Sequence, residues 1–188
     1  MTISTVAARI AARIAVISAV FGLVLTGAEA ASKASGGGYA PPYSEIVVDV
    51  RTGKVLRAVN PDSPRHPASI TKVMTLYLLF EQLEAGKMSL STPIRISEWA
   101  ARQSPSKLGL NPGETITVDD AIKAIVTRSA NDIAVAVAEA VGGSEKDFAA
   151  MMTQKARSIG MKRTFYANAS GLPNPRQTTT ARDLVVLG

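Results

Sequence analysis

The sequence contains no cysteine and only one histidine, His66. Without cysteine the chain cannot form disulfides or bind a metal through thiolates. One histidine is too few for a zinc site, whose ligands are usually several imidazoles or thiolates. A lone histidine in a loop is also more often structural than part of a Ser-His-Asp triad. We therefore expect no metal and no cofactor.

Basic residues are in excess but do not form a cluster. The 21 lysines and arginines outnumber the 15 acidic residues, which gives a net charge of +6. They are scattered, with no run of five or more, whereas nucleic-acid binding needs a dense basic patch. We expect no nucleic-acid partner. A solvated basic surface is the simplest interpretation, and attraction to anionic lipid or wall polymer, with membrane-surface association, is the alternative.

The sequence also lacks an apolar run long enough for a bilayer-spanning helix, which needs about 20 residues. A shorter uncharged run, residues 14–25, follows Arg9 and Arg13 and precedes Ala28-Glu29-Ala30. This order is typical of a secretory signal peptide with its cleavage site. We expect a signal peptide at residues 1–30 and export to the periplasm or to the outer face of the cytoplasmic membrane. An uncleaved anchor is the alternative.

The remaining chain divides into a short leader and one domain. Residues 31–42 contain the run Gly36-Gly37-Gly38, and glycine- and serine-rich segments of this kind are flexible. Residues 43–188 carry the regular hydrophobic patterns of a folded domain. We expect a flexible leader at 31–42 and a single domain at 43–188.

The domain begins with strand patterns and continues as helix. Residues 45–50 and 55–59 are β-rich and flank a turn signal, so they predict a β-hairpin. The rest of the sequence offers no further clear strand. Helices are expected at 69–83, 97–102, from 117 to about 129, at 132–141, at 144–160, and from 180 onward. The first of these is apolar nearly all round, which predicts a helix buried within the domain.

The sequence Ser69-Ile70-Thr71-Lys72 stands at the opening of that apolar helix. Positions three apart share one face of a helix, so the hydroxyl and the amine can meet. A serine needs an adjacent base to become a nucleophile, and a lysine serves as one if burial favours its neutral form. The structural alternative is Ser69 as a helix cap and Lys72 as a solvated side chain.

Ser129-Ala130-Asn131 lies between two predicted helices. A loop of this kind can direct a hydroxyl and an amide into a cleft. The structural alternative is that Ser129 or Asn131 caps the helix that follows. The two motifs together, in this order, are more specific than either alone, because S-x-x-K with S-D-N and K-T-G marks penicillin-binding proteins and class A β-lactamases. Here Ala130 stands where β-lactamases commonly have aspartate.

On these motifs the chain resembles the serine-type D-alanyl-D-alanine carboxypeptidases, which are low-molecular-mass penicillin-binding proteins. The resemblance extends from about residue 43 to the end. The segments that carry it are Pro67–Thr75, Asn111–Val118, Ser129–Asp132, Asn168–Leu172 and Thr179–Leu184. It implies an α+β fold of the β-lactamase/transpeptidase-like, or penicillin-binding, type.

The resemblance also implies the site residues. Ser69 would be the acylated nucleophile and Lys72 would take its proton. Ser129 would relay a proton to the leaving group, and Asn131 would hold the carbonyl of the substrate peptide. The Ser69 N–H would be one of two oxyanion donors. The implied reaction removes the terminal D-alanine of peptidoglycan stem peptides, and β-lactams would acylate the same serine as inhibitors.

One family motif, Lys-Thr-Gly, is absent from the 188 residues. In the family this motif lies on a late strand that binds the substrate carboxylate and supplies the second oxyanion donor. We therefore expect residues 43–188 to be a partial catalytic domain, limited to the first β-hairpin and the helical lobe. An inactive remnant, or a non-catalytic binder of wall peptides, is the alternative. A β-lactamase is less favoured, since the Glu-x-x-Leu-Asn segment of class A enzymes is also absent.

Overall fold

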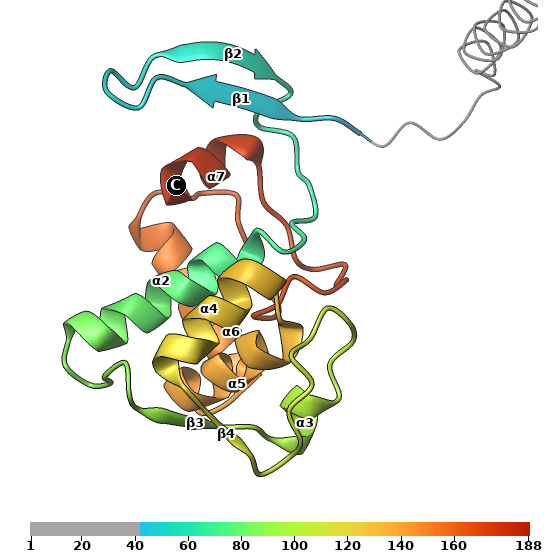
Figure 1. Cartoon of the computed structure of the whole chain (residues 1–188). Coiled ribbons are helices and arrows are strands. Elements are labelled where there is room, and N and C mark those ends of the chain that lie inside the picture. The colour runs from blue at the N-terminus through green and yellow to red at the C-terminus, as the bar shows by residue number, and fades with distance from the viewer. Residues whose placement is uncertain (1–41) are drawn as a thin grey trace, which may run out of the picture. The chain divides into compact units, whose positions relative to one another are not determined.

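The computed structural model describes residues 42–188, so the predicted signal peptide and most of the predicted leader lie outside the described residues. Figure 1 shows a β-hairpin followed by a mainly helical body. The elements are β1 (Glu45–Val48), β2 (Val55–Val59), α2 (Thr71–Glu84), β3 (Pro93–Arg95), α3 (Glu98–Ala101), β4 (Thr115–Thr117), α4 (Val118–Arg128), α5 (Asn131–Gly142), α6 (Glu145–Ser158) and α7 (Ala181–Leu187).

The predicted hairpin is present. Strands β1 and β2 pair antiparallel, with Glu45 opposite Val59. The Asp49 carboxylate accepts hydrogen bonds from the N–H groups of Arg51 and Thr52 at 3.0 and 2.9 Å. An aspartate that bonds to the backbone just ahead of it stabilises a tight turn, which is why this short segment specifies its own reversal.

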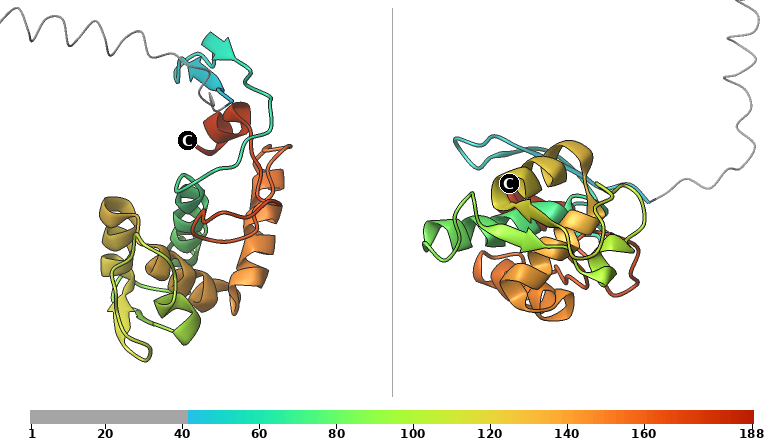
Figure 2. Two further views of the ribbon diagram at one scale, coloured as in Figure 1. Left: turned by 90° about the vertical axis from the view of Figure 1, so that its right-hand side faces the viewer. Right: turned by 60° about the horizontal axis from the view of Figure 1, so that its bottom comes forward.

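Helix α5 forms the centre of the helical body (Figure 2). Its residues 133–138 are all 0% exposed, and it contacts α2, α3, α4 and α6. The helix consists largely of alanine and valine, whose small side chains let the surrounding helices approach closely. One apolar cluster joins α5 to α3, α4, β3 and β4, and a second joins it to α2 and α6.

The predicted helix starts are confirmed at three caps. The hydroxyls of Thr117, Ser144 and Thr180 each accept a hydrogen bond from the N–H three residues later, at the start of α4, α6 and α7. Such caps satisfy N–H groups that a helix leaves unpaired. Within residues 42–188, none of the helices is both long and apolar enough to cross a membrane.

The prediction that the first helix is buried on nearly all sides was wrong. One face of α2 packs into the body through Met74, Leu78 and Leu79. On the opposite face Tyr77 and Phe80 are 36% and 48% exposed. An apolar pattern reports which residues favour burial, but the elements within residues 42–188 leave these two side chains partly exposed.

A second two-stranded sheet was not expected from the sequence. Strands β3 and β4 pair antiparallel, with Ile94 opposite Ile116, and both isoleucines are buried. Each strand has three residues, which is too short for the alternation that marks a strand in sequence. Packing against α5 and α4 stabilises this sheet.

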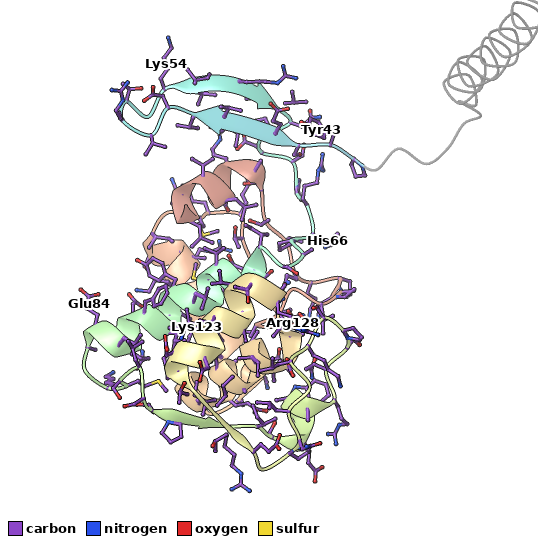
Figure 3. The ribbon with its side chains drawn as sticks, in the orientation of Figure 1. Tyr43, Lys54, His66, Glu84, Lys123 and Arg128 are labelled. Atoms are coloured by element: carbon purple, nitrogen blue, oxygen red, sulfur yellow. The ribbon has the colours of Figure 1, made fainter. Side chains whose placement is uncertain are left out.

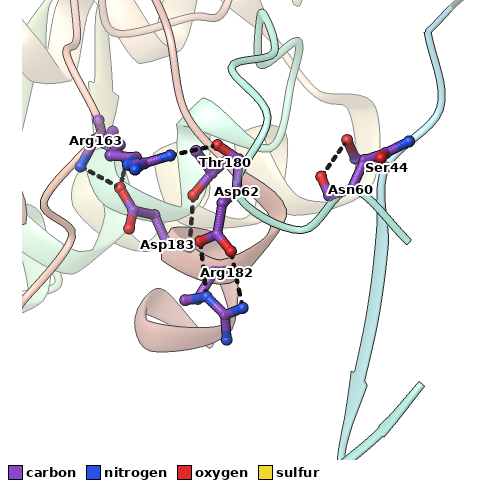
Figure 4. Close-up of polar contacts among 8 residues, drawn as sticks. Ser44, Asn60, Asp62, Arg163, Thr180, Arg182 and Asp183 are labelled. Atoms are coloured by element: carbon purple, nitrogen blue, oxygen red, sulfur yellow. Dashed lines mark hydrogen bonds and ion pairs between the residues drawn. The ribbon is translucent and has the colours of Figure 1, made fainter. Parts of the chain in front are cut away.

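The C-terminal helix is tied to the loop that follows the hairpin (Figure 4). Arg182 forms two hydrogen bonds with the Asp62 carboxylate, at 2.7 and 2.9 Å. Arg65 and Thr179 exchange two backbone hydrogen bonds of 2.8 Å. The chain that leads into Ser69 is therefore held against the segment just before α7.

Candidate active site

Ser69 lies in a tight turn just before α2. The N–H groups of Thr71 and Lys72 bond to carbonyls three residues back, those of Ala68 and Ser69, at 3.0 Å each. Regular α-helix then begins at Thr71, two residues later than the sequence suggested. The helix has Ile70 at its N-cap without a side-chain bond, so Ser69 is not a structural cap. It is exposed to solvent.

Lys72 is the buried centre of the site. Its side chain is almost inaccessible, with the residue 3% exposed. The ammonium group donates to Asn131 Oδ1 at 2.7 Å and to the Ser170 carbonyl at 2.6 Å, and it lies 3.5 Å from Ser69 Oγ. Burial lowers the pKa of Lys72 from 10.5 to about 8, because a charged amine loses its hydration there. The two side chains that the sequence spacing brings together therefore lie next to each other, and the pKa of the lysine is lowered.

Asn131 reaches Lys72 because a neighbouring loop fixes both its backbone and its side chain. Its N–H donates to the Ser106 carbonyl at 2.8 Å, and its Nδ2 donates to the Ser104 carbonyl at 3.0 Å. This arrangement directs Oδ1 at the Lys72 ammonium. An asparagine amide has two N–H donors, so a second hydrogen remains for another acceptor. The next residue, the buried Asp132, accepts from two N–H groups of the same loop.

Ser129 ends α4 in the left-handed conformation, with φ 55° and ψ 37°. Few residues other than glycine adopt this backbone, and such outliers concentrate at functional sites. The α5 N-cap is Ala130 and makes no side-chain bond, so neither Ser129 nor Asn131 has the structural capping role. The Ser129 hydroxyl forms no hydrogen bond with the residues that the structure describes. Hydrogen bonds thus join Ser69, Lys72 and Asn131, whereas Ser129 borders them.

Three residues that shape the site were not predicted from the chemistry of their side chains. The Ser170 carbonyl bonds to Lys72 through the backbone, so its residue type gave no signal. Gln177, 1% exposed, connects the 167–168 backbone to Thr71. Gly171 approaches the backbone of Ala68. The resemblance had marked the segment from Asn168 to Leu172, without indicating what it contacts.

His66 contacts the backbone of a distant segment. Its Nδ1 lies 2.7 Å from the Gln177 carbonyl, and Figure 3 shows it on the loop between the hairpin and α2. A cavity of about 430 Å³ opens beside this loop. Its lining residues are His66, Pro67, Ala68, Gly171, Leu172, Pro173, Asn174, Pro175 and Gln177. Across residues 42–188, acidic and histidine side chains do not gather into a group that could hold a metal ion.

Comparison with known proteins identifies a family. The family model described as D-alanyl-D-alanine carboxypeptidase matches residues 39–188. The D-alanyl-D-alanine carboxypeptidase DacF of Bacillus subtilis is 39% identical over 144 residues, which cover 77% of this chain and 37% of that protein. DacC of Escherichia coli is 36% identical over 149 residues, again 37% of its length. The chain thus spans less than two fifths of these relatives.

Solved structures agree. The D-alanyl-D-alanine carboxypeptidase DacD from Francisella tularensis superposes with a TM-score of 0.75 at 37% identity, covering 81% of this chain and 37% of that one. Penicillin-binding protein D2 from Listeria monocytogenes, solved in its cefotaxime-bound form, gives a TM-score of 0.68 at 28% identity, covering 81% and 62%. The expected α+β penicillin-binding fold is confirmed for the part of it that this chain contains.

Proposed function

Because the chain belongs to the D-alanyl-D-alanine carboxypeptidase family, we propose that it carries the nucleophile half of a serine enzyme that removes terminal D-alanine from peptidoglycan stem peptides. One observation supports this most strongly. Lys72 is buried, has its pKa lowered to about 8, and lies between Ser69 and Asn131. A structural lysine would gain nothing from burial without a carboxylate partner, since burying an unpaired charge is costly.

The proposed reaction proceeds through an ester on Ser69. Neutral Lys72 takes the hydroxyl proton while Ser69 Oγ attacks the carbonyl carbon of the penultimate D-alanine. The C–N bond to the terminal D-alanine then breaks, and the leaving amine takes a proton. Water hydrolyses the ester and restores the serine. Splitting a difficult hydrolysis into two easier steps is the advantage of a covalent intermediate.

Two further groups have roles in this proposal. Ser129 relays the proton to the leaving amine, and its left-handed backbone at the end of α4 is the feature that supports a directed role. Asn131 binds the substrate's peptide carbonyl through its second amide hydrogen. The Ser69 N–H has no acceptor among the described residues and serves as one oxyanion donor. A β-lactam would acylate Ser69 in the same way, because its strained amide replaces the scissile bond.

The test is covalent labelling with a penicillin. We expect the intact mass of the chain to increase by one β-lactam on prolonged incubation, and Ser69→Ala to remain unlabelled. Ser91→Ala is the matched control, because Ser91 bonds only to the hydroxyl of nearby Ser89 and its loss should leave labelling unchanged. An adduct of equal yield on Ser69→Ala would refute the nucleophile assignment.

We also propose that the chain is exported and acts at the outer face of the cytoplasmic membrane or in the periplasm. The leader pattern of residues 1–30 supports this. The expected mature N-terminus is at or near Ala31, which N-terminal sequencing of protein recovered from the periplasm would identify. Recovery of residues 1–30 intact on that protein would contradict the proposed cleavage.

A further inference from the structure

The turn from Asn168 to Gly171 closes on itself. The Asn168 Oδ1 accepts a hydrogen bond from the Gly171 N–H at 2.8 Å, and its Nδ2 donates to the Leu172 carbonyl at 2.9 Å. Ala169 and Ser170 are 0% and 1% exposed. The turn is therefore a defined, buried element, although it contains no helix or strand.

This turn contacts the first turns of α2 through its backbone. The Ser170 carbonyl accepts from Lys72 Nζ at 2.6 Å, and the Ala169 carbonyl accepts from Thr75 Oγ1 at 2.7 Å. Gly171 lies so close that a Cβ there would be 2.0 Å from the Ala68 carbonyl oxygen and 3.1 Å from the Ser69 nitrogen. Its φ of +83° is also a conformation that favours glycine. Only a residue without a side chain allows this approach.

The side chain of Gln177 connects the 168–171 turn to helix α2. Its Oε1 accepts from the N–H groups of Ala167 and Asn168 at 3.0 and 3.2 Å, while its Nε2 donates to Thr71 Oγ1 at 3.2 Å. Because Thr71 adjoins Lys72, the single amide group ties the backbone before the turn to the residue beside the buried lysine.

We propose that Gly171 and Gln177 are positioning residues, which hold the 168–171 turn against the Ser69 turn and keep the Ser170 carbonyl on Lys72. The proposal deepens the proposed function, on which it rests, by naming what keeps the lysine amine in place. Neither residue touches the reacting atoms. The absence of a Cβ at position 171 sets the distance between the two turns, and the Gln177 amide prevents them from separating.

The buried state of Lys72 depends on this contact. The hydrogen-bond partners of its ammonium group come from the Ser69 turn, α5 and the 168–171 turn, and none of them is charged. Among the described residues Lys72 forms no ion pair. Desolvation is therefore the cause of its lowered pKa, and the turn supplies one wall of the desolvated site. If the turn moved away, water would reach the amine and the pKa would rise.

The test measures the Lys72 pKa by NMR titration of the ¹³Cε signal in the full 188-residue chain, with Lys72→Arg to assign the signal. Gly171→Ala is expected to raise the pKa by about one unit or more as water enters. Gly113→Ala is the matched control, because Gly113 has a similar φ of +90° but nothing within 4 Å of its Cβ position. It should leave the Lys72 pKa unchanged.

Thr71→Val is the milder variant, which removes only the hydroxyl that Gln177 contacts and should raise the pKa by a smaller amount. If Gly171→Ala does not fold, as judged by circular dichroism, the Lys72 pKa in Thr71→Val tests the proposal. An unchanged pKa in the folded variants would overturn the proposal, and so would an equal shift in Gly113→Ala. A pKa that responds as expected in a chain that no penicillin labels would instead refute the proposed function and leave the positioning intact.

Discussion

Replacing Lys72 by methionine is expected to slow acylation of Ser69 by about 10²–10⁴-fold, the range that a positioned general base contributes. Methionine keeps the length of the side chain but cannot take the proton. The rate is followed as adduct mass against time with excess penicillin. Lys123→Met is the matched control, because Lys123 is exposed on α4 and pairs with Asp119 at 2.6 Å. It should leave the rate unchanged, and equal rates in both variants would exclude Lys72 as the base.

If Lys72 is the base, its pKa also determines how the acylation rate depends on pH. Only the neutral amine is a base, so acylation should rise with pH through about 8, the pKa of Lys72, and then level off. At pH 7 this pKa leaves about one lysine in ten neutral, compared with about three in ten thousand at an unperturbed pKa. A profile that instead rises through about 10.5 would show that burial does not tune the base.

The lowered pKa of Lys72 also predicts how the free energy of unfolding changes with pH. The folded-state pKa of Lys72 is lowered from 10.5 to about 8, so between these values the unfolded chain binds more protons. The free energy of unfolding therefore increases with pH from about 8. Above pH 10 the effect reverses, because burial raises the pKa of Tyr166 above its ordinary value of 10.0. Urea unfolding at several pH values, with Lys72→Met as reference, would measure the increase in the free energy of unfolding that Lys72 causes.

A longer chain that adds the late strand with Lys-Thr-Gly after residue 188 is expected to release D-alanine at least about 10²–10³-fold faster than the 188 residues alone. Removing one oxyanion donor typically costs that factor. The loss of the carboxylate anchor adds to it, because a substrate that is not held in place forfeits the entropic advantage of binding. We therefore expect little or no carboxypeptidase activity from residues 31–188, although Ser69 and Lys72 are in place.

The measurement is D-alanine release from a peptide that ends in D-Ala-D-Ala, for both forms at equal concentration. Two variants of the longer form serve as controls. Changing the lysine of its Lys-Thr-Gly to alanine should reduce the rate, and Ser69→Ala should abolish it. Comparable rates for the short and long forms would show that the late strand is dispensable. In that case the non-catalytic alternative for the short chain would also be excluded.

Features that depend on neighbouring residues could be predicted from the sequence. The caps at Thr117, Ser144 and Thr180 and the Asp49 turn all rely on hydrogen bonds that span three residues or fewer. Local chemistry alone specifies them, so they form wherever the segment is placed. The spacing in Ser69-Ile70-Thr71-Lys72 predicted a shared face for the same reason.

Features that depend on distant segments could not be predicted. The three-residue strands β3 and β4 exist because Ile94 and Ile116 are buried together against α5. The exposure of Tyr77 and Phe80 depends on what covers α2. Neither is encoded in a periodic pattern, because a pattern describes which face is apolar and not what packs on it.

The candidate site divides in the same way. From the sequence alone came the proposed nucleophile, its proposed base and the Ser129–Asn131 motif, since each is a short pattern of side chains with recognisable chemistry. Only the tertiary structure decided that Asn131, 59 positions from Lys72, accepts its hydrogen bond, and that the Ser170 carbonyl, 98 positions away, accepts another. A backbone carbonyl has the same chemistry in every residue, and desolvation arises from the packing of α2, α5 and the 168–171 turn. The lowered pKa that would make Lys72 a base is therefore a property of the fold and not of the motif.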